Sequence, residues 1–317
     1  MAMDRGTPTS PILTCTEQGK EVANLKAMKT PETPSANVLI NRALAIEDED
    51  ARSAGALGFM ARAMVQATLP HSKVAGNEFV RVNGNFTLTL QAPSAIGLPY
   101  GSVPRLLLAW LTTEAVRTKS RDLILGDSMA AFMRELGMIP SGGAKGDITR
   151  LKEQTRRLFN STVTASYEDG NTVADMGYRL TDKSVLWWNS PDPKQAGLWE
   201  STVTLSEPFF REVIDRPVPI DIRAIKALKR SPLALDIYSW LTYRMSYLKR
   251  PTVIPWAAVA MMLGSNYADI RFFRRAFLIE LRKVLLVYPE VKVEPLDDGL
   301  MIRPSPTHIP MKGGKHG

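Results

Sequence analysis

Apolar and polar positions along the chain follow the periods of helices and strands, and one order of elements occurs twice. In the first copy, helical spacing at 101–118 precedes a strand-like run at 123–125. A second helix is predicted at 128–136, before Gly137, which suits a C-cap, and a third at 147–159. Four β-rich stretches follow, at 161–168, 173–180, 184–189 and 201–206.

The second copy repeats this order. A helix is predicted at 231–248, a strand at 252–254, a second helix at 256–263 before Gly264, and a third at 269–288. A hairpin closes the copy, with strands at 291–295 and 300–304 on either side of the turn Asp297-Asp298-Gly299.

Short matches accompany the shared order. Trp-Leu-Thr occurs in both first helices (110–112 and 240–242), Leu-Gly ends both second helices, and Asp-Ile opens both third helices. Helix, strand, helix, turn, helix and hairpin is the order of the winged-helix form of the helix-turn-helix, which presents the later helix to the major groove of DNA. The sequence therefore predicts an α+β fold with two tandem winged-helix domains and β-hairpin wings.

The region before the repeats carries weaker signals. Helical spacing predicts a helix at 51–69, with the acidic run 47–50 at its N-terminal end. We interpret that run as a solvated helix start, and a divalent-metal site is the alternative. Alternating apolar residues on both sides of Asn83-Gly84 predict a β-hairpin over 78–90.

These patterns divide the chain into five segments. Residues 1–35 and 304–317 are rich in Pro, Ser, Thr or Gly, and we expect a flexible N-terminal segment and a flexible tail. Residues 36–77 form an N-terminal helical extension, 78–215 the first winged-helix domain and 216–303 the second.

The two third helices carry the candidate binding residues. At about 100° per residue, Ile148, Leu151, Thr155 and Leu158 share one face of the first, and Phe273, Phe277, Leu281 and Val284 one face of the second. Basic residues gather on the opposite faces, where arginine can bind phosphate or guanine and glutamine can bind adenine. The predicted DNA-binding residues are Lys145, Arg150, Gln154, Arg156, Arg157, Arg271, Arg274, Arg275 and Arg282.

Two further features bear on this interface. Leu278 lies within the second basic stripe, where it has no role, contacts a thymine methyl or meets a protein partner. The basic segment 222–230 is expected to link the two domains or to contact the DNA backbone.

Composition supports a polyanion partner and opposes several other classes. Lysine and arginine number 40 against 32 acidic residues, and the pI is about 9.5. The single cysteine, Cys15, excludes an internal disulfide and fits a reducing cytoplasm. Three scattered histidines make a metal site unexpected, so we predict no cofactor. No apolar run approaches the roughly 18 residues of a membrane span, and we expect a cytoplasmic protein.

The glycine-rich stretch 140–151, PSGGAKGDITRL, poses the question of a nucleotide site. A phosphate-binding P-loop needs lysine directly after its last glycine and then Ser or Thr. Here Lys145 precedes Gly146 and Asp147 follows, so Asp147 is interpreted as an N-cap. The stretch is predicted to be the turn of a helix-turn-helix, with Lys145 near a DNA phosphate.

No catalytic motif accompanies this pattern, and we predict that the protein is not an enzyme. The chain has no dinucleotide-binding glycine motif, nucleophile elbow or histidine pair for a nicking nuclease. Trp187, Trp188 and Trp199 are expected mainly in the core, and stacking on single-stranded bases is the alternative.

Long stretches of the chain resemble the RepA-type replication initiators of broad-host-range bacterial plasmids. They include EDARSAGALGFMARAMVQATLPH, GNEFVRVNGNFTLTL, GLPYGSVPRLLLAWLTTEAVRTKSRDLILGDS and SPLALDIYSWLTYRMSYL, and the resemblance extends over about residues 45–303. It implies two winged-helix domains that bind repeated origin sequences (iterons) in double-stranded DNA. It also implies recruitment of the host initiator DnaA and the replicative helicase, a homodimer that represses its own promoter, and a place in the bacterial cytoplasm with the nucleoid or plasmid.

Three alternatives stay open at this point. A repressor of the same fold would bind DNA without initiating replication. A primase or nicking nuclease would show cleavage or primer synthesis. A protein-interaction module would use its winged helices for dimerisation and would bind DNA weakly or not at all.

Overall fold

The computed structural model describes residues 34–66, 68–126, 128–144, 146–186, 201–264 and 267–310. The chain forms two units, Met1–Val38 and Leu39–Gly317. Helix α2 (Pro34–Asp48) begins in the first unit, and every later element lies in the second. Residues 1–33 of the predicted flexible segment, Lys145 and the three tryptophans at 187, 188 and 199 fall outside the described residues.

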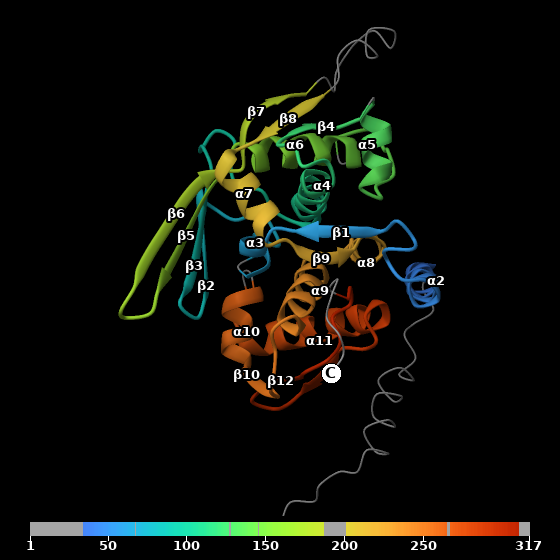
Figure 1. Cartoon of the computed structure of the whole chain (residues 1–317), viewed down its shortest axis with the longest axis vertical. Coiled ribbons are helices and arrows are strands. Elements are labelled where there is room, and N and C mark those ends of the chain that lie inside the picture. The colour runs from blue at the N-terminus through green and yellow to red at the C-terminus, as the bar shows by residue number, and fades with distance from the viewer. Residues whose placement is uncertain are drawn as a thin grey trace, which may run out of the picture. The chain divides into compact units, whose positions relative to one another are not determined.

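The first copy of the repeat has the predicted order of elements (Figure 1). It consists of α4 (Ser102–Thr118), β4 (Asp122–Ile124), α5 (Met129–Glu135), α6 (Asp147–Phe159), β7 (Thr181–Val185) and β8 (Thr202–Leu205). Its strands form an antiparallel sheet in the order β4-β8-β7. Local chemistry sets the bounds: α4 ends before Lys119, whose φ is +56°, and Ser128 caps α5 by accepting the N–H of Ala131.

The second copy consists of α9 (Pro232–Met245), β10 (Thr252–Pro255), α10 (Trp256–Leu263), α11 (Ile270–Val287), β11 (Lys292–Pro295) and β12 (Gly299–Arg303). Ser231 caps α9 at the N–H of Ala234, and Pro232 occupies the first turn, where its missing N–H costs nothing. The strand order is β10-β12-β11. Counted within each copy, both sheets have the order first, third, second, and the predicted repetition of elements is confirmed.

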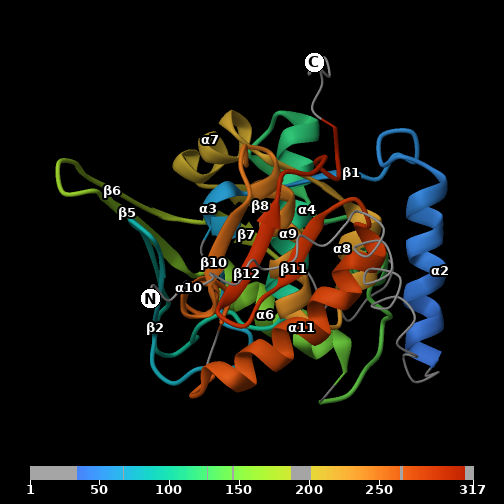
Figure 2. The ribbon, with the colours of Figure 1, turned by 90° about the horizontal axis from the view of Figure 1, so that it is seen from below.

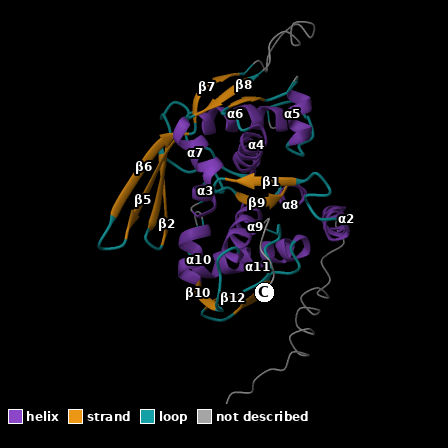
Figure 3. Cartoon of the chain, in the orientation of Figure 1, coloured by secondary structure: helices purple, strands orange, loops and turns teal. Residues whose placement is uncertain are grey.

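A further sheet combines a hairpin that precedes α4 with a hairpin that is inserted between α6 and β7. It contains β2 (Glu78–Asn83), β3 (Phe86–Gln91), β5 (Thr162–Glu168) and β6 (Val173–Arg179), in the order β2-β3-β5-β6. Figures 1 and 3 show it projecting to one side of the helices. The predicted hairpin at 78–90 is confirmed, and its two-residue turn begins at Gly84, whose φ of +59° is the conformation that such turns favour.

A strand and a short helix precede each copy, and the two strands pair with each other between the copies. These are β1 (Leu57–Met60) with α3 (Arg62–Gln66), and β9 (Val218–Asp221) with α8 (Ile222–Leu228). Strands β1 and β9 pair antiparallel, and Figure 1 shows this pair between α4 and α9. Helix α7 (Glu207–Asp215) leads from the first copy to β9.

The predicted helix at 51–69 is therefore wrong over most of its length. A Cβ at Gly58 would lie 2.3 Å from the Ile222 side chain, so the chain approaches α8 closely only with glycine there. The Phe59 N–H donates to Thr113 Oγ1 at 2.9 Å, and pairing with β9 satisfies other backbone groups. These tertiary contacts outweigh the local helical spacing.

The acidic run 47–50 accordingly overlaps the C-terminal end of α2, which includes Glu47 and Asp48, and does not open a helix. Asp50 accepts hydrogen bonds from the Ser53 hydroxyl and from the backbone N–H groups of Ser53 and Arg52, which lower the pKa of its carboxyl. Among the described residues no cluster of three or more potential metal ligands occurs.

The predicted flexible tail is wrong for residues 304–310, which pack on the second copy. Ile309 is buried, and the Tyr288 hydroxyl donates to the Pro306 carbonyl at 2.5 Å. His308 stacks on Tyr288 and lies 2.6 Å from the Tyr238 hydroxyl.

Buried side chains of both copies join in one hydrophobic cluster, which includes Leu107 of α4, Phe159 of α6, Ile237 of α9 and Phe277 of α11. The third helices are thus positioned by a shared core. In the part of the chain that the structure describes, no helix has the length and apolar character needed to span a membrane.

Candidate nucleic-acid interface

Helix α6 has the predicted extent, and its apolar face is confirmed. Leu151, Thr155 and Leu158 are buried, whereas Arg150 and Arg156 are exposed. Arg150 pairs with Asp147 at 2.9 Å. Such an exposed pair contributes about 0–1 kcal/mol, so it does not keep Arg150 from a stronger partner. The Arg156 side chain makes no hydrogen bond or ion pair with any other described residue.

The predicted exposure of Gln154 is wrong. Its side chain is 1 % exposed, and its Oε1 accepts the N–H of Tyr100 at 2.8 Å. Gln154 lies only about 40° around the helix from the buried Leu158, and the chain before α4 covers that flank. A buried glutamine cannot contact a base edge, so its role is to satisfy a backbone donor.

Arg157 is also committed to the fold. It is 13 % exposed and pairs with Glu153 at 2.8 Å. Its Nη1 donates to the Leu98 carbonyl at 3.0 Å, and its guanidinium lies over the Tyr100 ring at 5.4 Å. We describe Arg157 as an anchor because it fixes α6 to the segment that leads into α4.

The glycine-rich stretch folds over the start of α6. The prediction that Asp147 is the N-cap is wrong, because Asp147 is the first helical residue. The N-cap is Gly146, which has no side chain for capping. Ser141 takes over this role: its Oγ accepts the Asp147 N–H at 3.0 Å and its carbonyl accepts the Ile148 N–H at 3.2 Å. These helix N–H groups are therefore occupied, which removes a basis for phosphate binding there. The prediction for Lys145 lies outside the described residues.

Helix α11 confirms its predicted buried stripe of Phe273, Phe277, Leu281 and Val284. Its opposite side exposes Arg271, Arg275 and Arg282. Arg271 is 87 % exposed and forms a two-oxygen pair with Asp269, which caps the helix by accepting the Arg271 N–H. The Arg275 side chain makes no hydrogen bond or ion pair within the described residues.

Arg274 is the counterpart of Arg157. Its Nη2 donates to the Leu296 carbonyl at 3.1 Å, and its Nη1 donates to the Asp297 carbonyl at 3.2 Å. Its guanidinium lies over the Trp256 ring at 5.3 Å. Arg274 thus anchors α11 to the turn between β11 and β12. Leu278, expected within the exposed stripe, is half-buried and packs against the core.

Two exposed large apolar residues on the Arg275 side of α11 escaped the sequence analysis. Phe272 is 66 % exposed and Ile279 is 46 % exposed, on the same side as Arg275. A signal was present: adjacent residues on a helix point about 100° apart, so Phe272 and the buried Phe273 could not both face the core.

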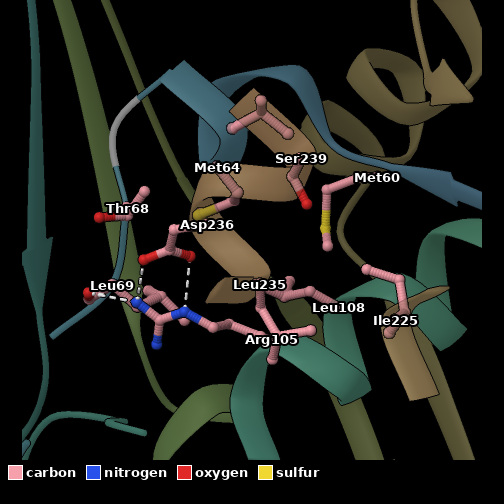
Figure 4. Close-up of a pocket in the computed structure, with 11 residues that line it drawn as sticks. Met60, Met64, Thr68, Leu69, Arg105, Leu108, Ile225, Leu235, Asp236 and Ser239 are labelled. Carbon is pink, nitrogen blue, oxygen red and sulfur yellow. Dashed lines mark hydrogen bonds and ion pairs between the residues drawn. The ribbon is translucent and has the colours of Figure 1, made fainter. Parts of the chain in front are cut away.

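A buried ion pair joins the first helices of the two copies (Figure 4). Arg105 of α4 donates through Nε and Nη2 to the two carboxylate oxygens of Asp236 of α9, at 2.6 and 2.7 Å. Its other N–H groups donate to main-chain carbonyls. His71 Nε2 lies 2.8 Å from Asp236 Oδ2. The pair fixes α4 against α9. It therefore helps to fix the positions of the third helices, α6 and α11, relative to each other.

The surroundings of this pair shift its titration. Burial alone would raise the pKa of the Asp236 carboxyl, but Arg105 and the hydrogen bond from His71 hold it below its ordinary value. Burial lowers the pKa of His71. The adjoining cavity, lined by Met64, Thr68 and Ser239 among others, measures about 10 Å³. That is room for about one water molecule, so the cavity is structural and is not a ligand site.

The basic segment 222–230 contacts the region at the end of α2 as well as the first copy. Arg223 donates to the carbonyls of Ala45 and Glu49, and the Lys226 carbonyl accepts from Arg42. The Lys229 ammonium donates to the Gly137 carbonyl at the end of α5. The Lys226 stem packs on Gly137, and desolvation lowers the pKa of its ammonium. These contacts accord with the predicted link between the copies.

Comparisons with known proteins find one family and similar solved structures. The family described as plasmid encoded RepA protein matches residues 98–257, half of the 317-residue chain. No curated protein matches the chain. The chain is similar to two crystal structures of domains 2 and 3 of RctB, one a selenomethionine derivative, each with 14 % sequence identity. Their TM-scores are 0.49 and 0.47, and the matches cover 75 % and 76 % of this chain and 94 % and 96 % of the RctB chains.

The family match extends from just before α4 to the start of α10. It therefore includes the whole first copy with α6, the buried Arg105–Asp236 pair and the link between the copies. The chain belongs to the family of plasmid-encoded RepA proteins, which are replication initiators.

Proposed function

We propose that this protein initiates plasmid replication by binding iterons in double-stranded origin DNA, with each copy of the repeat acting as a winged-helix domain. The observation that carries the proposal is the outward side of α11, where Arg271, Arg275 and Arg282 are all exposed opposite a buried apolar stripe. A helix of this width fits the major groove, and arginine binds phosphate or guanine through two donors.

The arrangement of the two third helices supports a shared binding site. Figure 1 draws α6 and α11 in opposite halves of the protein along the long axis, and Figure 2 draws both in the lower half of its view. Helices separated in this way along one side suit successive major grooves of one duplex. The proposed contacts are Arg150 and Arg156 in α6 and Arg271, Arg275 and Arg282 in α11.

The hairpin tips have a different charge. Asp297 and Asp298 form the turn between β11 and β12, and Glu168 and Asp169 lie at the tip of β5 and β6. Carboxylates repel the phosphate backbone, so we propose that these tips stay away from the duplex. Binding then depends on the helices, and its affinity falls steeply with salt as phosphate contacts release counterions.

Other parts of the proposal rest on the family. Origin opening, recruitment of DnaA and of the replicative helicase, and a repressing homodimer are properties that the RepA resemblance implies. We also propose that the protein needs no cofactor and catalyses no reaction.

An origin-dependent transformation assay tests the function. A plasmid that carries the origin but lacks its initiator gene is introduced into cells that express this chain, or its Arg271→Ala/Arg275→Ala variant. We expect transformants with the wild type and about tenfold fewer or none with the variant. A repressor would bind the DNA in a gel shift but give no transformants.

The gel shift separates the remaining alternatives. Specific binding that weakens steeply with salt supports the proposal, whereas absent or salt-independent binding supports a protein-interaction module. Cleavage or primer synthesis by the purified chain would identify an enzyme.

A further inference from the structure

The outward side of α11 carries apolar residues in line with its arginines. Phe272, Arg275, Ile279 and Arg282 are spaced three, four and three residues apart, so they form one stripe along the helix. Phe272 is 66 % exposed and Ile279 46 % exposed. Single exposed apolar residues are common, but two large ones on one stripe with two arginines form a mixed surface.

The core does not require Phe272. The neighbouring Phe273 is fully buried and contacts the Tyr267 and Phe277 rings at centroid distances of 5.7 Å each. Phe272 lies in the first turn of α11, which is the part of a recognition helix that contacts base edges. Its position therefore places an aromatic ring where DNA contacts concentrate.

The charges on this stripe of α11 indicate that its binding partner is DNA. Every charged residue of the stripe is an arginine, and the acidic residue of the helix, Glu280, is half-buried and pairs with Lys283 at 2.8 Å. A surface of cations and apolar groups complements the major groove, where phosphates flank the C5-methyl groups of thymine. An apolar protein partner would gain nothing from the arginines.

We propose that Phe272 is a specificity-determining residue that contacts the C5-methyl of a thymine in the binding site, with Ile279 beside it. This inference rests on the proposed function, since it needs α11 in the major groove. It assigns thymine recognition to the second copy. In the described part of α6 no large apolar side chain is exposed, so that helix lacks an equivalent contact.

Thymine-to-uracil substitution tests this directly, because deoxyuridine differs from thymidine only by the missing methyl. Duplexes are made of the footprinted site with each thymine replaced in turn, and binding of the full chain is measured by gel shift. We expect wild-type protein to lose about fourfold in affinity at one or two positions, the effect of one buried methyl group. The Phe272→Ala variant should bind the unmodified site about four- to tenfold more weakly and show no further loss at those positions.

A matched control is Phe272→Leu, which keeps an apolar contact and should retain part of the thymine preference. Because Phe272 is exposed, its variants should unfold at the wild-type temperature. Uniform binding of all uracil duplexes by the wild type, or an unchanged pattern in Phe272→Ala, would overturn the inference while leaving specific DNA binding intact. Loss of self-association in Phe272→Ala with unchanged DNA binding would overturn it in favour of a protein contact. Failure of the wild type to bind the unmodified site would overturn the proposed function itself.

Discussion

The third helices of the two copies occupy the same place in the order of elements but present different surfaces. Each uses one arginine as an anchor over an aromatic ring, Arg157 over Tyr100 in α6 and Arg274 over Trp256 in α11. Helix α6 contains four basic and two acidic residues in all and exposes no large apolar side chain. Helix α11 contains five basic residues and one acidic residue in all and exposes Phe272.

The difference shows that equal topology does not imply equal roles. Packing fixes where each helix lies, and residues outside the core stripe decide what each helix can bind. The polar outward side of α6 suits phosphate contacts, which orient a protein on DNA, whereas the mixed side of α11 suits base contacts. We therefore expect substitutions in α11 to affect sequence discrimination more than substitutions in α6.

Breaking the buried Arg105–Asp236 ion pair should have the largest effect, because this pair holds α4 against α9 and thereby fixes the relative positions of α6 and α11. Asp236→Ala removes the partner of buried Arg105 and should cost about 3–5 kcal/mol of unfolding free energy. Urea titration measures this loss. The double variant Arg105→Met/Asp236→Leu should recover most of it, since no buried charge is left unpaired.

Asp182→Ala is the matched surface control, because Asp182 pairs with Arg121 at 2.7 Å in an exposed setting. It should cost less than about 1 kcal/mol. A cost for Asp236→Ala as small as that of the control would mean that the ion pair does not hold the two copies together.

The second prediction compares the two unpaired arginines of the third helices. Arg275→Ala should lose about 1–3 kcal/mol of binding free energy on the specific site and relax discrimination there. Arg156→Ala should lose less, and equally on specific and random DNA, as expected for a phosphate contact. Gel shifts with both duplexes measure the two losses, and the reverse ranking would contradict the proposed division between α11 and α6.

A third test separates two roles for Gln154, the structural role of accepting the Tyr100 N–H and the base contact that the sequence predicted. Gln154→Met removes the acceptor of the Tyr100 N–H, and an unsatisfied buried donor costs about 1–3 kcal/mol. We expect reduced thermal stability with unchanged discrimination between specific and random DNA. A stable variant that loses discrimination would instead support the base contact predicted from the sequence.

The smallest expected effect is a pH dependence of stability. Burial lowers the pKa of His308, whose Nδ1 lies 2.6 Å from the Tyr238 hydroxyl, and burial also lowers the pKa of His71. Histidine in the unfolded chain has a pKa of about 6.5. Below that pH these two histidines therefore bind protons more readily in the unfolded chain than in the folded protein. Stability is then full above about pH 6.5 and falls as the pH decreases further.

Unfolding temperatures between pH 7.5 and 5.5 measure this slope. His308→Phe lowers stability at pH 7.5 but should give a shallower slope, with the remainder due to His71. An unchanged slope in the variant would show that His308 does not contribute.

Sequence periodicity predicted the elements well where a helix buries one continuous stripe. The bounds 147–159 of α6 agree with the structure because Leu151 and Leu158 recur at helical spacing and glycines precede them. Strand β1 was missed because its conformation depends on β9, about 160 residues away in the chain. Helical spacing says nothing about such a partner.

The candidate site was predictable only in outline. Projection onto a helix identified the basic sides of α6 and α11, but burial of Gln154 depends on the segment at Tyr100. The anchoring of Arg274 depends on the turn at Asp297. The search for basic residues did not draw attention to Phe272, although its position next to the buried Phe273 places it away from the core.

Footprinting of the full chain on plasmid DNA flanking its gene tests iteron recognition by the two third helices. We expect protection of tandem repeats spaced by about two helical turns, with major-groove contacts in each repeat. Protection of a single inverted repeat, or of no discrete sequence at concentrations that saturate random DNA, would contradict iteron recognition by the two third helices.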